Sequence, residues 1–297
     1  MNKTKQFLLK MRNALGALFV ITIVMVVPLF SFVELGHFFQ EGSSRSAKAL
    51  PALQARPADT GAGKPQLFEE PIITVTFDDG YLTTYTKAMP ILQKYGIRST
   101  QYVLSGTADN PTYMSWEQIA NMQRAGHEIA CHTIDHSELT GLDDTDLENQ
   151  IKSCKKELTK RFGLIKNFAA PYGSQDARTQ AVIAKYFTSQ RNTIGDPKNG
   201  IDQYDVNLAK NFDRNNIIGV TVRSDTTIED IQKLIDYAEA NNGWLVLTYH
   251  QNDDHGSVYS LDTPQMDAQM KYLAGTDVRI VTLQDALDSL EVQTGEF

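Results

Sequence analysis

The sequence predicts an α/β protein built on a parallel sheet that is either doubly wound or closed as a barrel. From residue 71 onward, short apolar segments typical of strands alternate with segments of helical period. Polar residues follow several of these strands directly, where a (β/α) barrel builds its active site. No GxGxxG fingerprint follows the first strand and no P-loop motif is present, so the sequence carries no nucleotide-binding signature.

The first half of this region is predicted from apolar runs, helix caps and glycine stops. The apolar run Ile72–Phe77 indicates a buried strand. Residues 115–118 have the pattern of a capping box that opens a helix, and Gly126 follows as its C-cap. Further strands are predicted over residues 97–104, 128–131 and 166–170. Helices are predicted over residues 83–95, 116–125, 146–162 and 176–185.

The second half begins with residues 187–225, which are predicted to be rich in loops because they show no sustained period. Residues 226–241 carry an apolar face at helical spacing, and Trp244–Tyr249 is a buried strand. Proline at the first helical position starts another helix at residues 263–264. A last strand is predicted over residues 278–281, and the helix after it is capped by Thr282 and Asp285.

The N-terminal region predicts a membrane anchor. Residues 14–33 contain no charged residue, and this run is long enough to cross the hydrocarbon core as a helix. Four basic residues precede it. A cleaved signal peptide is the alternative, but its first small-x-small site lies far beyond the apolar run, at residues 47–49. We therefore favour a retained single-pass anchor in the cell membrane.

This interpretation divides the chain into five parts. Residues 1–13 are expected in the cytoplasm because their basic side chains stay inside. After the anchor, residues 34–70 are rich in Ala, Ser, Gly and Pro and predict a flexible linker. Residues 71–290 form the expected extracytoplasmic domain, and residues 291–297 are a short C-terminal tail.

Charge and cysteine content narrow the function classes. The net charge is −8, and the first 13 residues carry four basic and no acidic residues, so the outward-facing remainder is strongly acidic. Such a domain is a poor candidate for binding nucleic acid. The chain has 2 cysteines, Cys131 and Cys154. Export permits a disulfide between them, but two small buried hydrophobic side chains are the favoured reading.

Two acidic residues directly follow the first predicted strand, in the segment Thr76-Phe77-Asp78-Asp79-Gly80. Like charges at a strand end are unfavourable unless something positive offsets them. A bound metal, with one Asp as ligand and its neighbour free for proton transfer, explains the pair. A solvated Asp-Asp-Gly turn explains it as well.

A histidine pair favours the metal. His132 and His136 follow the predicted strand at 128–131, and they share a face if the segment is helical, although a turn could also bring them together. Two imidazoles with one carboxylate make a three-ligand site with open positions. Zinc suits such a site, and Co²⁺, Ni²⁺ or Mn²⁺ would also fit.

Two further segments complete a pattern: Phe168-Ala169-Ala170-Pro171-Tyr172-Gly173, and the buried strand 244–249 that delivers His250. Together with the Asp-Asp and His-x₃-His motifs, they resemble the polysaccharide deacetylases of carbohydrate esterase family 4, the NodB homology domain. The resemblance runs in family order from about residue 71 to residue 290. It implies a deformed (β/α) barrel that removes acetyl groups from N-acetylated glycans.

The resemblance also implies roles for individual residues. Asp79, His132 and His136 would hold the metal. Asp78 would be the general base and His250 the general acid.

The resemblance assigns the remaining residues to the substrate. The backbone N–H of Tyr172 would help to stabilise the oxyanion. Substrate contacts are expected from Pro171, Tyr172, Leu247 and Thr248.

The sequence departs from the family pattern in three places. Ala169 stands where the third motif usually has an arginine that orients the catalytic Asp, so the sequence does not name the residue that would hold Asp78. No Trp lies between Trp116 and Trp244 to supply the Asp-Trp pair that tunes the catalytic histidine. Thr248 replaces a usual leucine. The arginine-less third motif is similar to that of exported deacetylases acting on biofilm poly-N-acetylglucosamine.

The sequence therefore predicts a membrane-anchored, metal-dependent N-deacetylase of a cell-envelope or extracellular polymer such as poly-N-acetylglucosamine, peptidoglycan or a chitin-like chain. Two alternatives stay open. One is a glycan-binding protein with a degenerate site, suggested by Ala169 and the missing Asp-Trp pair. The other is a related hydrolase that cleaves the C–N bond of a small amide.

Overall fold

The computed structural model describes residues 68–195, 198, 201–252 and 257–294, with side chains in the last helix described to residue 290. These residues all lie in one compact unit of the chain, Gly61–Phe297. Segments 1–13 and 14–33, the linker except its last three residues, and the end of the tail lie outside the described residues. Within the described part, no helix combines the length and the apolar character needed to span a membrane.

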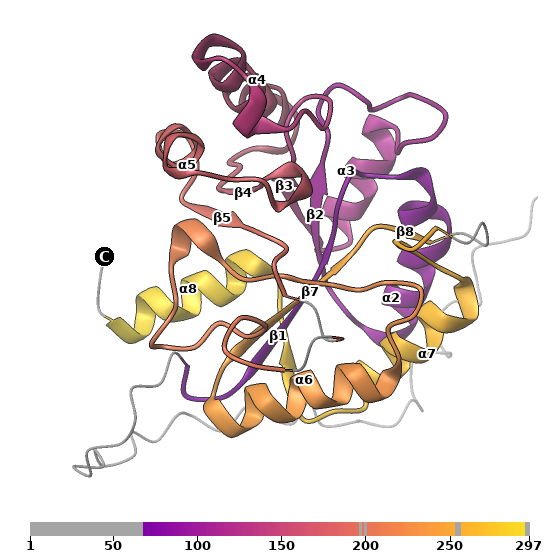
Figure 1. The fold of residues 1–297 in the computed structure, drawn as a ribbon. Helices are drawn as coiled ribbons and strands as arrows, with labels where there is room; N and C mark the ends of the chain where they lie inside the picture. The colour runs from indigo at the N-terminus through magenta and orange to yellow at the C-terminus, as the bar shows by residue number, and fades with distance from the viewer. Residues whose placement is uncertain (1–67, 196–197, 199–200, 253–256, 295–297) are drawn as a thin grey trace, which may run out of the picture. The chain divides into compact units, whose positions relative to one another are not determined.

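A parallel eight-stranded sheet forms the centre of this unit (Figure 1). Its strands are β1 (Ile72–Phe77), β2 (Thr100–Val103), β3 (Glu128–Cys131), β4 (Asn167–Ala169), β5 (Ser189–Arg191), β6 (Val220–Thr221), β7 (Trp244–Tyr249) and β10 (Arg279–Ile280). The strand order is β5-β4-β3-β2-β1-β7-β6, and β10 pairs with the start of β1. β1 pairs with β7 over its whole length, and every residue of both strands is buried.

The two edges of the sheet, β5 and β6, are linked by isolated bridges instead of a continuous ladder. Arg191 bridges Ile217, and Gly195 bridges Val220. The sheet is therefore a half-barrel, which confirms the predicted α/β class with a parallel sheet. A separate two-stranded ladder pairs β8 (Gln251–Asn252) with β9 (Ser260–Leu261) beyond the end of β7.

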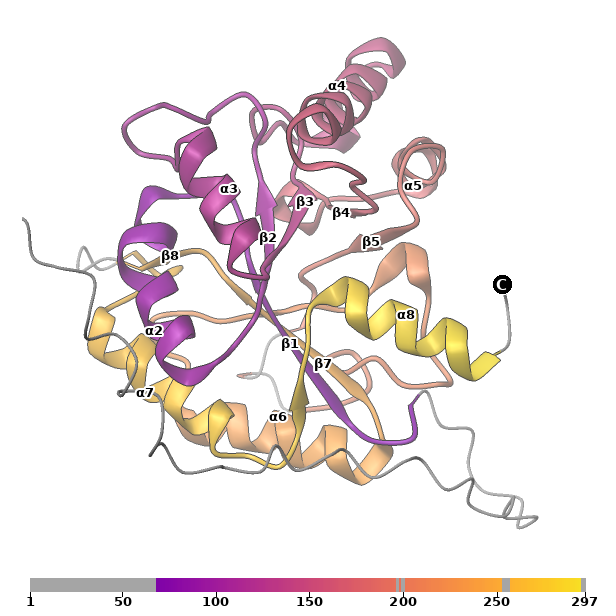
Figure 2. The same cartoon turned by 180° about the vertical axis from the view of Figure 1, so that it is seen from behind.

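Helices surround the strands, as the views from the two sides show (Figures 1 and 2). They are η1 (Thr84–Ala88), α2 (Met89–Tyr95), α3 (Trp116–Arg124), α4 (Asp144–Phe162), α5 (Ala177–Ile183), α6 (Ile228–Asn241), α7 (Thr263–Ala274) and α8 (Leu283–Thr294). The capping box predicted at Ser115 is present, with both reciprocal hydrogen bonds. The helix predicted over 83–95 begins with a π-helical turn, η1, before α2 continues it to Gly96.

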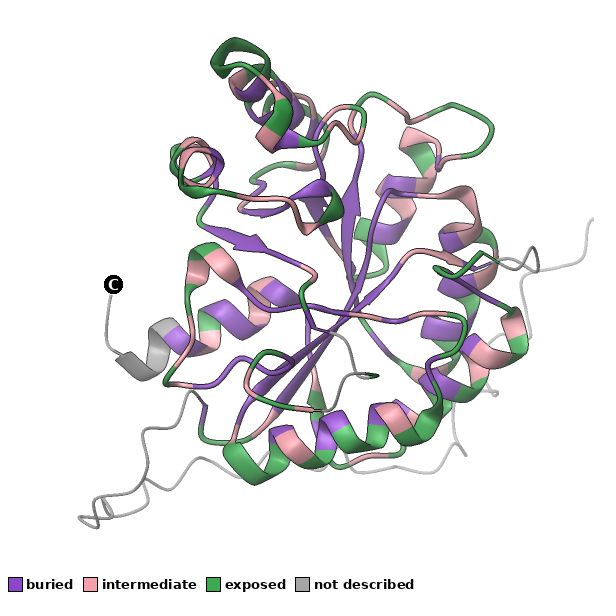
Figure 3. Ribbon diagram, viewed as in Figure 1, coloured by how far each residue is buried: buried purple, intermediate pink, exposed green. Residues whose placement is uncertain are grey.

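Buried apolar side chains form one core inside the half-barrel and two between the sheet and its helices. The strands are mostly buried, with the short β10 as an exception, whereas the helices alternate buried and exposed faces (Figure 3). The inner core joins Tyr102 and Trp244 to Leu287 of α8, so α8 packs against the interior of the half-barrel.

One expectation was incomplete and one was wrong. The described part of region 187–225 is rich in loops, as predicted, but it also contains β5 and β6. β5 was missed because it consists of the polar residues Ser189, Gln190 and Arg191, although all are buried. Cys131 and Cys154 are not free: they form a disulfide with a Cα–Cα distance of 6.3 Å. This bond ties the end of β3 to the middle of α4.

Candidate active site

The carboxyl ends of the strands surround a cavity of about 540 Å³. Six of the predicted site residues line it: Asp78, Asp79, His132, His136, Tyr172 and His250. The other predicted substrate contacts lie elsewhere. Leu247 belongs to the core between sheet and helices, Thr248 is buried and bonded to Thr76, and Pro171 is buried. Leu247, Thr248 and Pro171 are therefore not among the residues that line this cavity.

The turn after β1 directs two neighbouring carboxylates differently. The Asp78 N–H donates to the Tyr249 carbonyl at 2.9 Å and so continues the pairing of β1 with β7. Asp79 then has φ 70° and Gly80 φ 76°, both in the left-handed region. A Cβ at Gly80 would also lie 3.3 Å from Val103. This turn requires its glycine, and it separates the two carboxylates.

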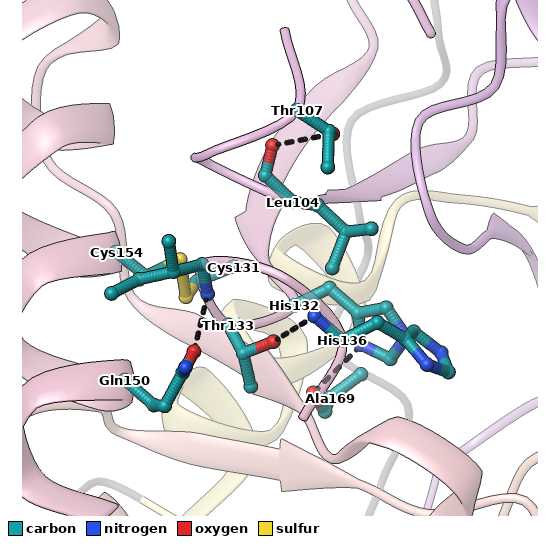
Figure 4. The surroundings of a disulfide bond; sticks show 10 residues. Leu104, Thr107, Cys131, His132, Thr133, His136, Gln150, Cys154 and Ala169 are labelled. Carbon is teal, nitrogen blue, oxygen red and sulfur yellow. Dashed lines mark hydrogen bonds between the residues drawn. A yellow bond between two sulfur atoms is a disulfide. The ribbon is translucent and has the colours of Figure 1, made fainter. Parts of the chain in front are cut away.

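A turn, not a helix, brings the two histidines together. Residues 132–137 contain no helix, and both Thr133 and His136 have positive φ, at 74° and 71°. The Thr133 hydroxyl accepts the His136 N–H at 3.0 Å and closes the turn. The imidazoles lie on one side of this segment and the disulfide on the other (Figure 4).

Asp79, His132 and His136 are grouped so that they could hold a cation. Asp79 Oδ1 lies 3.4 Å from His132 Nε2 and 3.2 Å from His136 Nε2. The three ligand atoms all lie within 4.8 Å of one another. Asp79 Oδ1 is buried and has no hydrogen-bond partner among the described residues. A buried, unpaired carboxylate oxygen facing two imidazoles is the arrangement that a divalent metal would satisfy.

The strand β4 fixes the tautomer of His132 through its backbone. His132 Nδ1 lies 2.8 Å from the Ala169 carbonyl oxygen (Figure 4). Because a carbonyl only accepts, Nδ1 carries the proton and Nε2 presents a lone pair toward Asp79. An outer partner of this kind orients metal-ligating histidines in general.

The carboxylates and histidines of the site shift one another's pKa values toward the charged forms. Burial alone would raise the pKa of Asp79, but His132 and His136 outweigh it and hold that pKa well below its usual range. Burial alone would lower the pKa of His132, but Asp78 and Asp79 outweigh it and raise it. The site thus concentrates negative charge where a cation would bind.

His250 faces Asp78 from β7. Its Nε2 lies 3.9 Å from Asp78 Oδ2, and burial lowers its pKa against the opposing effect of both carboxylates. Its Nδ1 has no hydrogen-bond partner within the described residues. This agrees with the absence from the sequence of an Asp-Trp pair that would hold that nitrogen.

Arg191 is the residue that sequence reasoning missed. Its Nη2 donates to Asp78 Oδ1, and its side chain has 0% exposure. The residue lies in β5, in the stretch interpreted as loops. Sequence patterns gave no local signal because the contact joins residues 113 positions apart.

Strained backbone gathers at the cavity. Tyr172 has φ 59°, is 69% exposed, and lies edge-on to His136 with ring centroids 4.5 Å apart. Among the described residues, six non-glycine residues have positive φ, and four of them are Asp79, Thr133, His136 and Tyr172. Strain of this kind persists only where surrounding structure enforces it, and it clusters at functional sites.

Comparison with known proteins gives relatives of one kind. Residues 67–188 match the model of the polysaccharide deacetylase family. A peptidoglycan-N-acetylglucosamine deacetylase of Bacillus cereus is 33% identical over 92 residues, which are 31% of this chain and 41% of that protein. A chitooligosaccharide deacetylase of Sinorhizobium fredii is 28% identical over 143 residues, 46% of this chain and 61% of that protein. The chain thus spans less than two thirds of these curated relatives.

Solved structures share the fold. Peptidoglycan deacetylase PdaC from Bacillus subtilis matches with a TM-score of 0.52 and 18% identity, covering 77% of this chain and 95% of that one. The Xyl-CE4 domain of a xylanase from the hindgut metagenome of Trinervitermes trinervoides matches with a TM-score of 0.50 and 16% identity, covering 76% and 92%. Residues 67–188 therefore match the polysaccharide deacetylase family model, and the described domain shares its fold with solved polysaccharide deacetylase structures.

Proposed function

We propose that this protein is a metal-dependent hydrolase that removes N-acetyl groups from an amino-sugar polysaccharide and releases acetate. The observation that carries the proposal is the unpaired Oδ1 of Asp79, buried beside two histidine Nε2 atoms. Asp79, His132 and His136 would hold the metal, and zinc suits these ligands. A cation held there would polarise the acetyl carbonyl and make an attacking water more acidic.

Asp78 is placed to act as the general base. Its Oδ2 faces the cavity, 4.0 Å from His132 Nε2 and 3.9 Å from His250 Nε2. The carboxylate takes a proton from the attacking water as the new C–O bond forms at the acetyl carbon. Asp78 can do this because its neighbour, Asp79, would bind the metal, so that Asp78 itself is not a metal ligand.

His250 is placed to act as the general acid. An amine leaves readily only when protonated, so a proton must reach the nitrogen as the C–N bond breaks. Burial lowers the pKa of His250, which makes its protonated ring a stronger acid than free histidine. The cycle closes when the proton that Asp78 took from the water passes to His250, which restores the charged carboxylate and the protonated ring, and the acetic acid product leaves as acetate and a proton.

Tyr172 contributes its backbone and its ring. We propose that its N–H stabilises the developing oxyanion, since the left-handed turn holds that residue at the cavity. The exposed ring offers an apolar face on which a sugar can stack. Tyr259 lies across the cavity beside His250, with ring centroids 5.3 Å apart, and offers a second such face.

The names of the relatives and the acidic composition of the chain support a substrate class. Relatives with 28–33% identity are named for peptidoglycan N-acetylglucosamine and for chitooligosaccharides. We propose a neutral or cationic cell-envelope or extracellular polymer of N-acetylglucosamine, including poly-N-acetylglucosamine. The anchor at residues 14–33 stays a prediction, and protease accessibility of the domain in intact cells checks it: a protected domain would contradict it.

Acetate release tests the function. Metal-free protein is supplied with Zn²⁺ or Co²⁺ and assayed on β-1,4- and β-1,6-linked N-acetylglucosamine oligomers and on peptidoglycan. We expect metal-dependent release that falls at least about 1,000-fold in Asp78→Asn. Asp144→Asn, an exposed carboxylate on α4, is the matched control and keeps full activity. Binding of oligomers without any acetate release would favour the glycan-binding alternative.

A further inference from the structure

Arg191 is a buried charge that the proposed mechanism does not use directly. Its side chain is fully buried inside the half-barrel, and its guanidinium packs 4.7 Å from the centre of the Tyr102 ring. Burying a guanidinium costs several kcal/mol unless a partner of opposite charge compensates. That partner is Asp78, through Nη2 and Oδ1.

The register of the sheet explains how Arg191 reaches Asp78. Ala169 of β4 and Arg191 of β5 are direct partners in the parallel ladder. Direct partners point to the same face of a sheet, so both side chains enter the interior of the half-barrel. Ala169 belongs to the inner core with Tyr102, the residue on which Arg191 stacks.

The neighbouring residues leave room for this side chain. A Cβ added at Gly219 would lie 2.7 Å from Arg191 Cδ and 2.5 Å from the Asn192 carbonyl oxygen. Ala169 fills little of the interior next to the arginine. The glycine and the alanine together keep open the space through which Arg191 extends from β5 toward β1.

We propose that Arg191 is the positioning residue of Asp78, delivered from β5 where the third motif on β4 has only Ala169. The inference rests on the proposed deacetylase function. Arg191 occupies Oδ1 of Asp78, so Oδ2 is the oxygen left to face His132 and His250 and to accept the proton. Arg191 itself is not among the residues that line the cavity.

This role predicts a defined kinetic signature. Arg191→Met keeps the bulk of the side chain but frees the Asp78 carboxylate to rotate. We expect kcat to fall about 100-fold with KM changed less than about twofold, because orientation is lost and substrate contacts are not. Zinc affinity stays unchanged, since Asp79 and the histidines remain. Arg191→Lys keeps the charge and retains more activity than Arg191→Met.

Two further variants sharpen the test. Arg191→Ala combined with Ala169→Arg moves the arginine one strand across, to its register partner. We expect the kcat of this double variant to be at least tenfold higher than that of Arg191→Ala alone. Arg124→Met, which breaks an exposed pair with Glu117 on α3, is the control and keeps full kcat.

A double-mutant cycle on unfolding decides the contact independently of activity. Urea midpoints are measured for Arg191→Met, Asp78→Asn and the double variant, and we expect strong non-additivity because each single variant leaves a buried group unpaired. An inactive wild type with this coupling intact would sink the deacetylase function alone. Three results would each overturn the role of Arg191. They are full kcat in Arg191→Met, shifts in the urea midpoint that simply add in the double variant, and a folded Arg191→Ala/Ala169→Arg protein as slow as Arg191→Ala.

Discussion

Asp79 and Glu128 are carboxylates at opposite ends of the same parallel sheet, and their surroundings differ completely. Asp79 follows the carboxyl end of β1, and its Oδ1 has no hydrogen-bond partner in the described structure. Glu128 begins β3, and its oxygens accept hydrogen bonds from the Thr100 hydroxyl at 2.8 Å, the Gln284 N–H at 2.9 Å and the Asn167 amide.

The comparison separates stability from function. The Glu128 network joins β2, β3 and β4 to the start of α8, so every donor there is used to hold elements together. The Asp79 end leaves polar atoms unsatisfied, which costs stability and makes sense where a ligand completes them. Function at the carboxyl ends of strands and stability at the opposite ends is the general division in β/α barrels.

The largest effect is expected from removing the unsatisfied carboxylate. Asp79→Ala deletes one of three metal ligands, so we expect acetate release to fall at least about 1,000-fold and zinc binding to be lost. The unfolding midpoint of the metal-free protein falls less than that of Glu128→Ala, because Asp79→Ala removes a charge interaction with His132 and His136 but leaves no hydrogen-bond donor of Oδ1 unpaired. Acetate assays, zinc titration and urea unfolding check this. Zinc binding retained in the variant would refute the ligand set.

The satisfied carboxylate should behave in the opposite way. Glu128→Ala leaves three donors without their partner, and we expect a loss of about 4 kcal/mol in the free energy of unfolding. The folded variant, assayed well below its melting temperature, keeps the kcat of the wild type. Glu117→Ala, an exposed carboxylate on α3, is the control and loses less than about 0.5 kcal/mol. A stable Glu128→Ala protein with impaired kcat would reverse the division between the two ends.

The disulfide Cys131–Cys154 lies at the carboxyl end of β3, the same end of the sheet as Asp79 and its unpaired oxygen. It closes a loop with a sequence separation of 23 and lies directly before His132. Replacing both cysteines by alanine should reduce the free energy of unfolding by roughly 3 kcal/mol, chiefly by loosening the unfolded chain. Urea unfolding of the variant and of the dithiothreitol-reduced wild type measures it. Equal midpoints with and without reductant would contradict the expectation.

His127 gives the opposite end of the sheet a pH dependence of its own. Its Nδ1 accepts the Ser99 N–H at 3.1 Å, and burial, assisted by Arg98, lowers its pKa to about 4 from 6.5. Between pH 6.5 and 4, the unfolded chain therefore binds a proton at His127 that the folded protein does not bind. Stability from this residue is complete above pH 6.5 and is lost as the pH falls toward 4, by at most about 3 kcal/mol.

Substitution isolates this contribution. His127→Asn keeps a hydrogen-bond acceptor but does not titrate, so its free energy of unfolding should depend less on pH between 6.5 and 4 than that of the wild type. Urea unfolding at several pH values compares the two proteins. Parallel pH curves would show that His127 is not the titrating group.

The three residues that could hold a metal were recognisable from sequence because each lies in a short motif at a strand end. Asp79 and its neighbour follow an apolar run, and His132 and His136 are four residues apart. The helix caps were equally local, as at Ser115. Their physical causes act within a few residues, so the pattern alone carries them.

The contact of Arg191 with Asp78, and the position of Leu247 and Thr248 away from the cavity, could not be predicted because they depend on register and on the face of a strand. β5 is buried but wholly polar, so it lacks the apolar period that indicates a strand. Leu247 and Thr248 are adjacent on β7, so one faces the helices and the other the interior, and neither reaches the cavity. Only the folded sheet settles which strand lies beside which.

Zinc titration into the metal-free protein, with acetate release measured at each step, tests most directly whether the unpaired oxygen of Asp79 is there to hold a cation. We predict one ion per chain and activity that rises in proportion to occupancy. We predict that Asp79→Ala neither binds zinc nor releases acetate, whereas Glu128→Gln binds one ion per chain and releases acetate in proportion to occupancy. Full acetate release without metal, or unchanged zinc affinity in Asp79→Ala, would contradict the account.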